Sequence, residues 1–170
     1  MECNMSSSGN AWSCTISLRL EYDGRGSPLS TGPRVISFGP QIVDKDQFEI
    51  SLRRAQAAIL NPHILQDSFL GKSEQEIKEM AQADPKTLKF SKNTVCVNIT
   101  DPEATDISFA DLPGKLRILY LFTPLMNVFF SGLIQNDEPE IVRLVHSLVT
   151  SYIERPEMII LVVVPMSGKC

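Results

Sequence analysis

The residues with the clearest chemical potential are Asp111-Leu112-Pro113-Gly114, which follow the β-type run "TDISFA". A strand that ends in Asp-x-x-Gly supplies two groups that nucleotide triphosphatases use. The carboxylate of Asp111 can hold a water molecule on Mg²⁺, and the backbone amide of Gly114 can approach a terminal phosphate closely because glycine has no Cβ. The same four residues are also typical of an ordinary turn after a strand, so the motif alone leaves both interpretations open.

A second candidate for phosphate binding is Gly71-Lys72-Ser73, but the residues before it do not match a phosphate loop. A phosphate loop reads Gly-x-x-x-x-Gly-Lys-Ser/Thr and follows a buried strand. Gln66 stands where the first glycine should be, and no buried strand leads into the segment. Ser73, with Glu76 three residues later, instead has the spacing of a helix N-cap and its capping box. The segment therefore predicts the start of a helix.

Other residues of catalytic or metal-binding type lack partners at useful spacing. His63 follows a helix-ending proline and His146 lies at the polar edge of a helical stripe, so metal binding is not expected of either. Ser167 lacks the Gly-x-Ser-x-Gly setting of a nucleophile. Three carboxylates flank a predicted turn and are expected to shape it rather than to bind a cation: Asp101, Glu103 and Asp106.

Composition narrows the class of protein. The chain has 170 residues, enough for one ordinary domain with a sizeable core, and a net charge of −4. Its Lys and Arg residues are scattered rather than gathered into a stripe, so no nucleic-acid partner is expected. The four cysteines share no metal spacing and the N-terminus has no apolar signal region, which together predict a cytoplasmic protein with reduced thiols.

Hydrophobic periodicity predicts an α/β fold. A period of two or a continuous apolar run predicts four strands, and a period of 3.6 predicts three helices. The strands are expected at 12–22, 94–100, 105–110 and 158–164, the helices at 44–60, 73–83 and 138–154, and a Gly/Pro/Ser-rich loop at 23–40. Turn chemistry in "DPEA" predicts a hairpin between the second and third strands. The run "MIILVVV" predicts a central strand that is covered on both faces, in a mixed sheet flanked by helices.

The order of several blocks resembles a known family. "NTVCVNITDPEATDISFADLPG" and "LIQNDEPEIVRLVHSLVTSYIERPEMIILVVVPMS" look like the G domain of dynamin-type large GTPases, in particular fungal dynamin-like proteins. "FGPQIVDKDQFEISLRRAQAAIL" and the opening "MECNMSSSGNAWSCTISLRLEY" fit the same family in the same order. The resemblance identifies residues 1–170 as a partial dynamin-type G domain of the P-loop GTPase fold.

The resemblance implies a GTPase whose relatives couple hydrolysis to membrane remodelling. It makes GTP and Mg²⁺ the expected ligands, with Asp111 as the residue that holds Mg²⁺ through water and Gly114 as the γ-phosphate sensor. It also implies homo-oligomers and membrane association for the full-length relatives. The chain departs from the family because it contains neither the phosphate loop nor the guanine-reading Thr/Asn-Lys-x-Asp. Whether this chain is an enzyme is therefore open, and we expect it to be inactive.

A second departure is an atypical apolar insertion at 115–132. Without it the sequence becomes "ISFADLPGLIQNDEPE", which resembles the family over its whole length. The insertion and the last residues, 168–170, both place Lys directly after a glycine, and Gly-Lys can be encoded by letters that match an intron's 5′ boundary. Two departures with one signature favour the hypothesis that both segments are retained introns.

Two alternatives to a catalytic role follow from the same region and from the sheet. Residues 116–134 are about as long as a membrane span, which makes a membrane-anchored fragment one alternative. Arg117, Pro124 and Asn127 interrupt the stretch, and such residues are costly in the middle of a bilayer. The other alternative is a non-catalytic fragment that binds a partner through an unpaired sheet edge.

Overall fold

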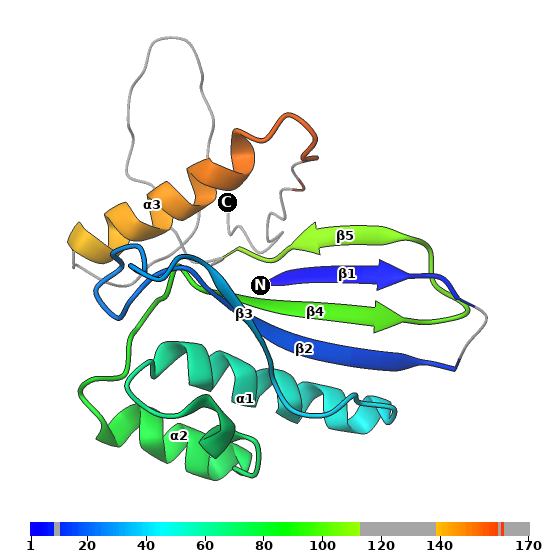
Figure 1. Cartoon of the computed structure of the whole chain (residues 1–170), viewed down its shortest axis with the longest axis horizontal. Coiled ribbons are helices and arrows are strands. Elements are labelled where there is room, and N and C mark those ends of the chain that lie inside the picture. Colours follow the sequence, from blue (N-terminus) through cyan, green and yellow to red (C-terminus); the bar gives the residue numbers. More distant parts are fainter. Residues whose placement is uncertain (9–10, 113–138, 160, 162–170) are drawn as a thin grey trace, which may run out of the picture. The chain divides into compact units, whose positions relative to one another are not determined.

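The computed structural model describes residues 1–8, 11–112, 139–159 and 161. The chain divides into two compact units, Met1–Asp111 and Leu112–Cys170, and each is described by itself. The first unit holds the sheet and two helices, of which one packs on the sheet and the other packs on that first helix (Figure 1). The second contributes one helix to the part of the chain that is described.

The first unit is built on a five-stranded mixed sheet with the order β3-β2-β4-β1-β5. β1 runs parallel to β4, and every other pair of neighbours is antiparallel. The strands are β1 (Glu2–Ser6), β2 (Ser13–Leu20), β3 (Arg34–Ser37), β4 (Thr94–Thr100) and β5 (Ile107–Ala110). The described chain is thus α/β with a mixed sheet flanked by helices, as the sequence predicts.

Three features of the sheet differ from the sequence prediction. β4 and β5 form no hairpin, because β1 lies between them and pairs with both. β1 itself is not predicted, although Cys3 and Met5 alternate with polar residues. The predicted loop at 23–40 contains β3, which pairs with the second half of β2. The pairing of β1 depends on partners more than 90 residues away, and periodicity carries no such information. β3 pairs with the strand directly before it, across the Gly/Pro/Ser-rich segment.

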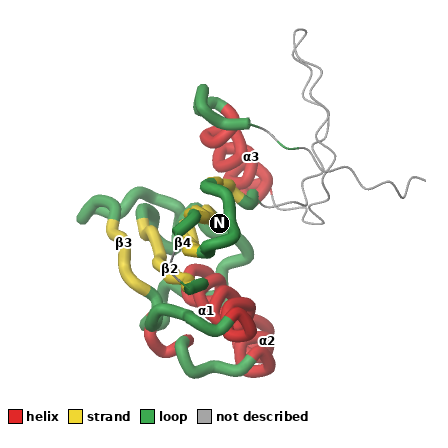
Figure 2. The backbone as a smooth tube through the Cα atoms, turned by 90° about the vertical axis from the view of Figure 1, so that its right-hand side faces the viewer, coloured by secondary structure: helices red, strands yellow, loops and turns green. Residues whose placement is uncertain are grey.

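The core lies between one face of the sheet and the first long helix, α1 (Phe48–Leu60). Alternate residues of β2 are buried on this face, and so are Val95 and Val97 of β4. The helix contributes Ala55, Ala58 and Ile59 to the same cluster, with Phe48 and Leu52 packed against it. Small alanine side chains let the helix backbone lie close to the sheet. Figure 2 shows the sheet edge-on with both helices on one side.

Side-chain caps mark the start of two helical segments in this unit, with Asp44 before the first and Ser73 before the second. The predicted helix at 44–60 is a 3₁₀ turn, η1 (Lys45–Gln47), that runs into α1, and the side chain of Asp44 caps the turn. A second 3₁₀ turn, η2 (Gln66–Phe69), buries Phe69 against α1. The predicted helix at 73–83 is α2 (Glu74–Ala83), which packs on α1. Both predictions are confirmed.

In the second unit, α3 (Pro139–Ile153) confirms the helix predicted at 138–154. Val145 and Tyr152 are buried, and the guanidinium of Arg155 lies 4.3 Å from the centre of the Tyr152 ring. The predicted strand at 158–164 falls mostly outside the described residues. Met158, Ile159 and Leu161 are described, and they are exposed and belong to no strand, so for these three the prediction of a buried strand is wrong.

Candidate functional site

The candidate site lies at the end of β5, where the chain emerges as Asp111. The backbone of Asp111 is fixed, because its N–H donates to the Met1 carbonyl at 2.8 Å and its carbonyl accepts from the Met1 amino group at 2.9 Å. The residue is exposed, so its carboxylate is open to solvent. A hydrogen-bonded backbone with an accessible carboxylate is compatible with a water-mediated cation ligand.

The amino group of Met1 is a cation that interacts with the charge of Asp111. Burial lowers the pKa of that amino group, while the negative charges of Asp111 and Glu2 oppose the shift. The Met1 amino group and Asp111 are therefore close enough to interact electrostatically. Gly114, the other residue predicted for this site, lies outside the described residues, as does the insertion at 115–132.

An ion pair crosses the sheet next to this site. The guanidinium of Arg19 on β2 donates two hydrogen bonds to the carboxylate of Glu2 on β1, at 2.7 and 2.6 Å. β4 lies between these strands, and Cys96 is the β4 residue opposite both Glu2 and Ser17. The hydrogen bonds to Glu2 raise the pKa of Arg19 above its ordinary value. Arg19 is thus committed to Glu2 and is poorly placed to hold a phosphate.

The segment Gly71-Lys72-Ser73 has the structural role that its surroundings predict. The Ser73 hydroxyl accepts the N–H of Glu76 at 3.3 Å, and the Glu76 carboxylate accepts the N–H of Ser73 at 2.7 Å. The carbonyl of Lys72 accepts a 2.7 Å hydrogen bond from Arg54. The element before it is η2, which is a helical turn rather than a strand. The capping box predicted for this helix is confirmed.

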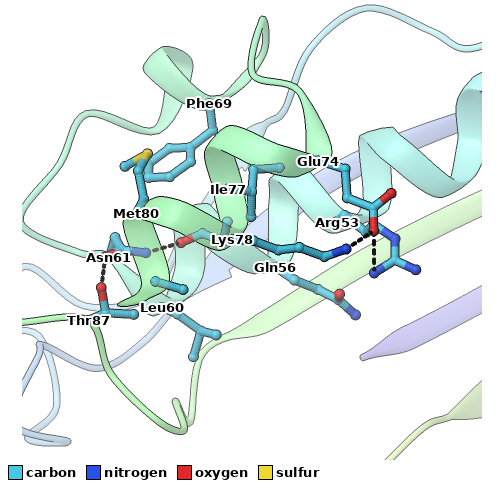
Figure 3. A pocket seen from close by; sticks show the side chains of 12 residues that line it. Arg53, Gln56, Leu60, Asn61, Phe69, Glu74, Ile77, Lys78, Met80 and Thr87 are labelled. Atoms are coloured by element: carbon cyan, nitrogen blue, oxygen red, sulfur yellow. Dashed lines mark hydrogen bonds and ion pairs between the residues drawn. The ribbon is translucent and has the colours of Figure 1, made fainter. Parts of the chain in front are cut away.

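A cavity of about 190 Å³ lies between α1 and α2. Figure 3 shows apolar side chains along its middle, including those of Leu60, Ile77 and Met80. At one end, Glu74 lies 2.7 Å from Lys78 and 3.9 Å from Arg53. At the other end, Asn61 donates to the Ala57 carbonyl and accepts from Thr87. Its charged and polar groups bind one another, so the cavity has the chemistry of a helix–helix junction.

Sequence reasoning missed one pair of chemically capable residues. His63 and Asp84 are 21 residues apart, and the His63 Nε2 lies 2.8 Å from an Asp84 oxygen. A hydrogen bond from the Lys86 backbone and then the one to His63 lower the pKa of Asp84. The pair joins the end of α1 to the end of α2, and spacing along the chain gives no sign of it. Among the described residues, no three His, Cys, Asp or Glu side chains form a group that could hold a metal ion.

Of the three carboxylates predicted to shape a turn, the structure shows Asp101 doing so. An oxygen of Asp101 accepts the N–H of Glu103, and the other Asp101 oxygen lies 3.5 Å from the Lys45 ammonium. Asp106 accepts the N–H of Ser7 at 2.7 Å. These contacts tie the turn before β5 to the rest of the sheet.

Comparison with known proteins adds no family. No protein-family model, no curated protein and no solved structure matches the chain. Within the ranges that the structure describes, no helix is both long and apolar enough to cross a membrane.

Proposed function

We propose that the chain is part of a dynamin-type G domain of the P-loop GTPase fold, in which Asp111 holds Mg²⁺ through water and Gly114 contacts the γ-phosphate of GTP. The proposal rests on the resemblance of the sequence blocks and on one structural observation. The carboxylate of Asp111 is exposed at the end of β5, while its backbone is fixed by two hydrogen bonds to Met1. A single carboxylate suits Mg²⁺, which keeps several waters and takes its other ligands from phosphates.

We further propose that this chain binds nucleotide weakly and does not turn it over. Phosphoryl transfer depends on backbone N–H groups and a lysine that neutralise the developing charge, and the 170 residues contain no phosphate loop. The residues that could substitute are engaged elsewhere: Ser73 caps α2, and Arg19 binds Glu2. The resemblance also implies homo-oligomers and membrane association. We propose these only for a protein that carries the complete G domain.

The test is a titration of the isotope-labelled chain with a non-hydrolysable GTP analogue, followed by NMR. We expect weak binding whose chemical-shift changes centre on Asp111 and Leu112 and require Mg²⁺. Asp111→Asn should remove the Mg²⁺ dependence, whereas Asp106→Asn, four residues before the end of β5, should not. An adenine analogue should bind equally, since no guanine-reading motif is present. Unchanged signals at Asp111 in millimolar nucleotide, or micromolar affinity that survives Asp111→Asn, would contradict the proposal.

A further inference from the structure

The outer edge of β5 is unpaired within the described part of the chain. β5 ends the sheet, with β1 on its inner side and no described strand on its outer side. Its side chains are open to solvent: Ile107 is 54% exposed and Phe109 44% exposed. Both lie on the face that carries Cys3 and Met5, their partners on β1. An exposed pair of large apolar side chains therefore borders an edge with no described neighbouring strand. Figure 1 shows β5 as the last strand on this side of the sheet.

The hydrogen-bond pattern identifies the backbone groups that this edge offers. Met1 and Asp111 exchange both of their backbone hydrogen bonds. Hydrogen-bonded pairs alternate along an antiparallel ladder, so the next such pairs are Cys3 with Phe109 and Met5 with Ile107. The N–H and C=O groups of Ser108 and Ala110 consequently point away from β1. The outer edge offers two donors and two acceptors in the spacing that another strand requires.

The sequence of β5 lacks the residues that usually protect an exposed edge, although the strand has only four residues, and a short edge strand is itself one form of protection. Natural proteins block such edges with lysine, proline, a bulge or a covering element. The strand reads "ISFA" and contains neither lysine nor proline. The side chains of Ile107, Ser108 and Phe109 are exposed. Main-chain hydrogen bonds next to alternate apolar side chains are the features by which domains bind an added strand.

The charge around the edge defines the chemistry of the partner. Exposed carboxylates stand at both ends of β5, Asp106 before it and Asp111 after it, with Glu103 close by in sequence. Residues 103–112 contain no Lys or Arg, while the Met1 amino group places one positive charge at the Asp111 end. A second copy of the chain would bring the same acidic ends to the edge, which disfavours self-pairing. A segment with basic ends would be attracted.

We propose that the outer edge of β5 binds an extended peptide segment of a partner protein as a sixth strand. The segment has apolar residues at alternate positions, which cover Ile107 and Phe109, and Lys or Arg at its ends, which face Asp106 and Asp111. Its backbone pairs with Ser108 and Ala110. This inference goes beyond the proposed function, because strand addition requires no nucleotide.

The experiment measures fluorescence anisotropy of the labelled peptide Lys-Val-Thr-Val-Thr-Val-Lys with the full chain. Ser108→Pro removes an outward donor and leaves the pairing with β1 intact, since proline is tolerated where the N–H faces solvent. The matched control is Val35→Pro on β3. Phe38 donates to Ile16, so by the same alternation the N–H of Val35 also points outward, at the opposite edge. We expect Ser108→Pro to weaken binding about tenfold and Val35→Pro to leave it unchanged.

Two peptide controls keep the test independent of how the variants fold. A peptide with Glu in place of both Lys residues should bind about tenfold more weakly at low salt. A peptide that is N-methylated on the residues facing β5 should lose binding, because its donors are removed. Equal binding of the basic and acidic peptides, or no effect of N-methylation, would overturn the proposal. Self-association of the chain that Ser108→Pro abolishes, with no binding of the basic peptide, would assign the edge to a second copy instead.

Discussion

Arg19 and Glu2 form a two-hydrogen-bond ion pair across the width of β4, although they lie on strands that are not neighbours in the sheet. Their side chains are 27% and 21% exposed, so the pair is partly shielded from water. It links β2 to the strand that begins the chain. Shielded, bidentate pairs contribute more than exposed single contacts.

We expect the pair to contribute measurably to stability. Arg19→Met and Glu2→Gln should each lower the free energy of unfolding, and a double-mutant cycle should give a coupling energy of about 1–2 kcal/mol. The measurement is urea denaturation followed by circular dichroism. The matched control is Lys45 with Asp101, at 3.5 Å and with the lysine side chain 66% exposed. That cycle should give almost no coupling, and equal coupling in the two cycles would contradict the role of shielding.

The capping box at Ser73 gives a prediction that separates a cap from a phosphate loop. Ser73→Ala should destabilise the chain by about 1 kcal/mol, because the N–H of Glu76 loses its acceptor. Ser73→Asp should retain most of the stability, since aspartate also caps helices. The change should leave nucleotide-induced shifts at Asp111 as they were. A loss of those shifts in Ser73→Ala, measured by the same NMR titration, would show that the segment binds phosphate after all.

Sequence reasoning succeeded where a single element decides its own structure. α1, α2 and β2 each carry an apolar pattern with a clear period and a capping or turn residue at an end, so their existence follows from local chemistry. The pairing of β1 between β4 and β5 does not, since it depends on contacts more than 90 residues apart along the chain. The motif predicts a role for Asp111, and the structure shows that this residue is exposed at the end of β5, while its role stays a proposal. The hydrogen bonds between Met1 and Asp111 and the pair of His63 with Asp84 could not be predicted, because each joins residues that are far apart in the sequence and no local pattern indicates them.

Alanine substitutions at Gly39 and Gly32 should lower the free energy of unfolding by different amounts. Gly39 and Gly32 both have a positive φ, of 75° and 77°. A Cβ at Gly39 would lie 3.1 Å from the Leu70 Cδ2, whereas one at Gly32 would meet nothing within 4 Å. Gly32→Ala should therefore cost only the backbone strain, about 1 kcal/mol, and Gly39→Ala should cost more. Thermal denaturation checks this, and Leu70→Val combined with Gly39→Ala should recover the excess. Equal losses at the two glycines would contradict the contact.

The buried thiols predict a loss of stability at high pH. Burial, together with the charge of Cys3, raises the pKa of Cys14 from its ordinary 9.0 to about 11. A thiol whose pKa is raised in the folded state holds its proton where the unfolded chain has released it. Its contribution is complete below pH 9 and disappears as the pH rises towards 11. Cys14→Ala should flatten this alkaline decline in urea-denaturation midpoints, and an unchanged slope would contradict the assignment.

The insertion at 115–132 lies outside the described residues, and its sequence predicts that it lowers solubility. Leu116, Ile118, Leu119 and their neighbours make it densely apolar, and it adjoins Asp111 and Gly114, the residues proposed for nucleotide. A switch segment responds to a phosphate contact, and a long apolar addition should hinder that response while promoting association. Deletion of residues 115–132 should raise the soluble, monomeric fraction in sedimentation.

The same deletion should strengthen the Mg²⁺-dependent shifts at Asp111, and Gly114→Ala in the shortened chain should weaken them again, because a Cβ would intrude where the backbone meets the phosphate. Transcript sequencing tests the origin of the segment independently. A mature message that contains 115–132, together with equal solubility of the two chains, would make the segment a native part of the protein and would contradict the retained-intron hypothesis.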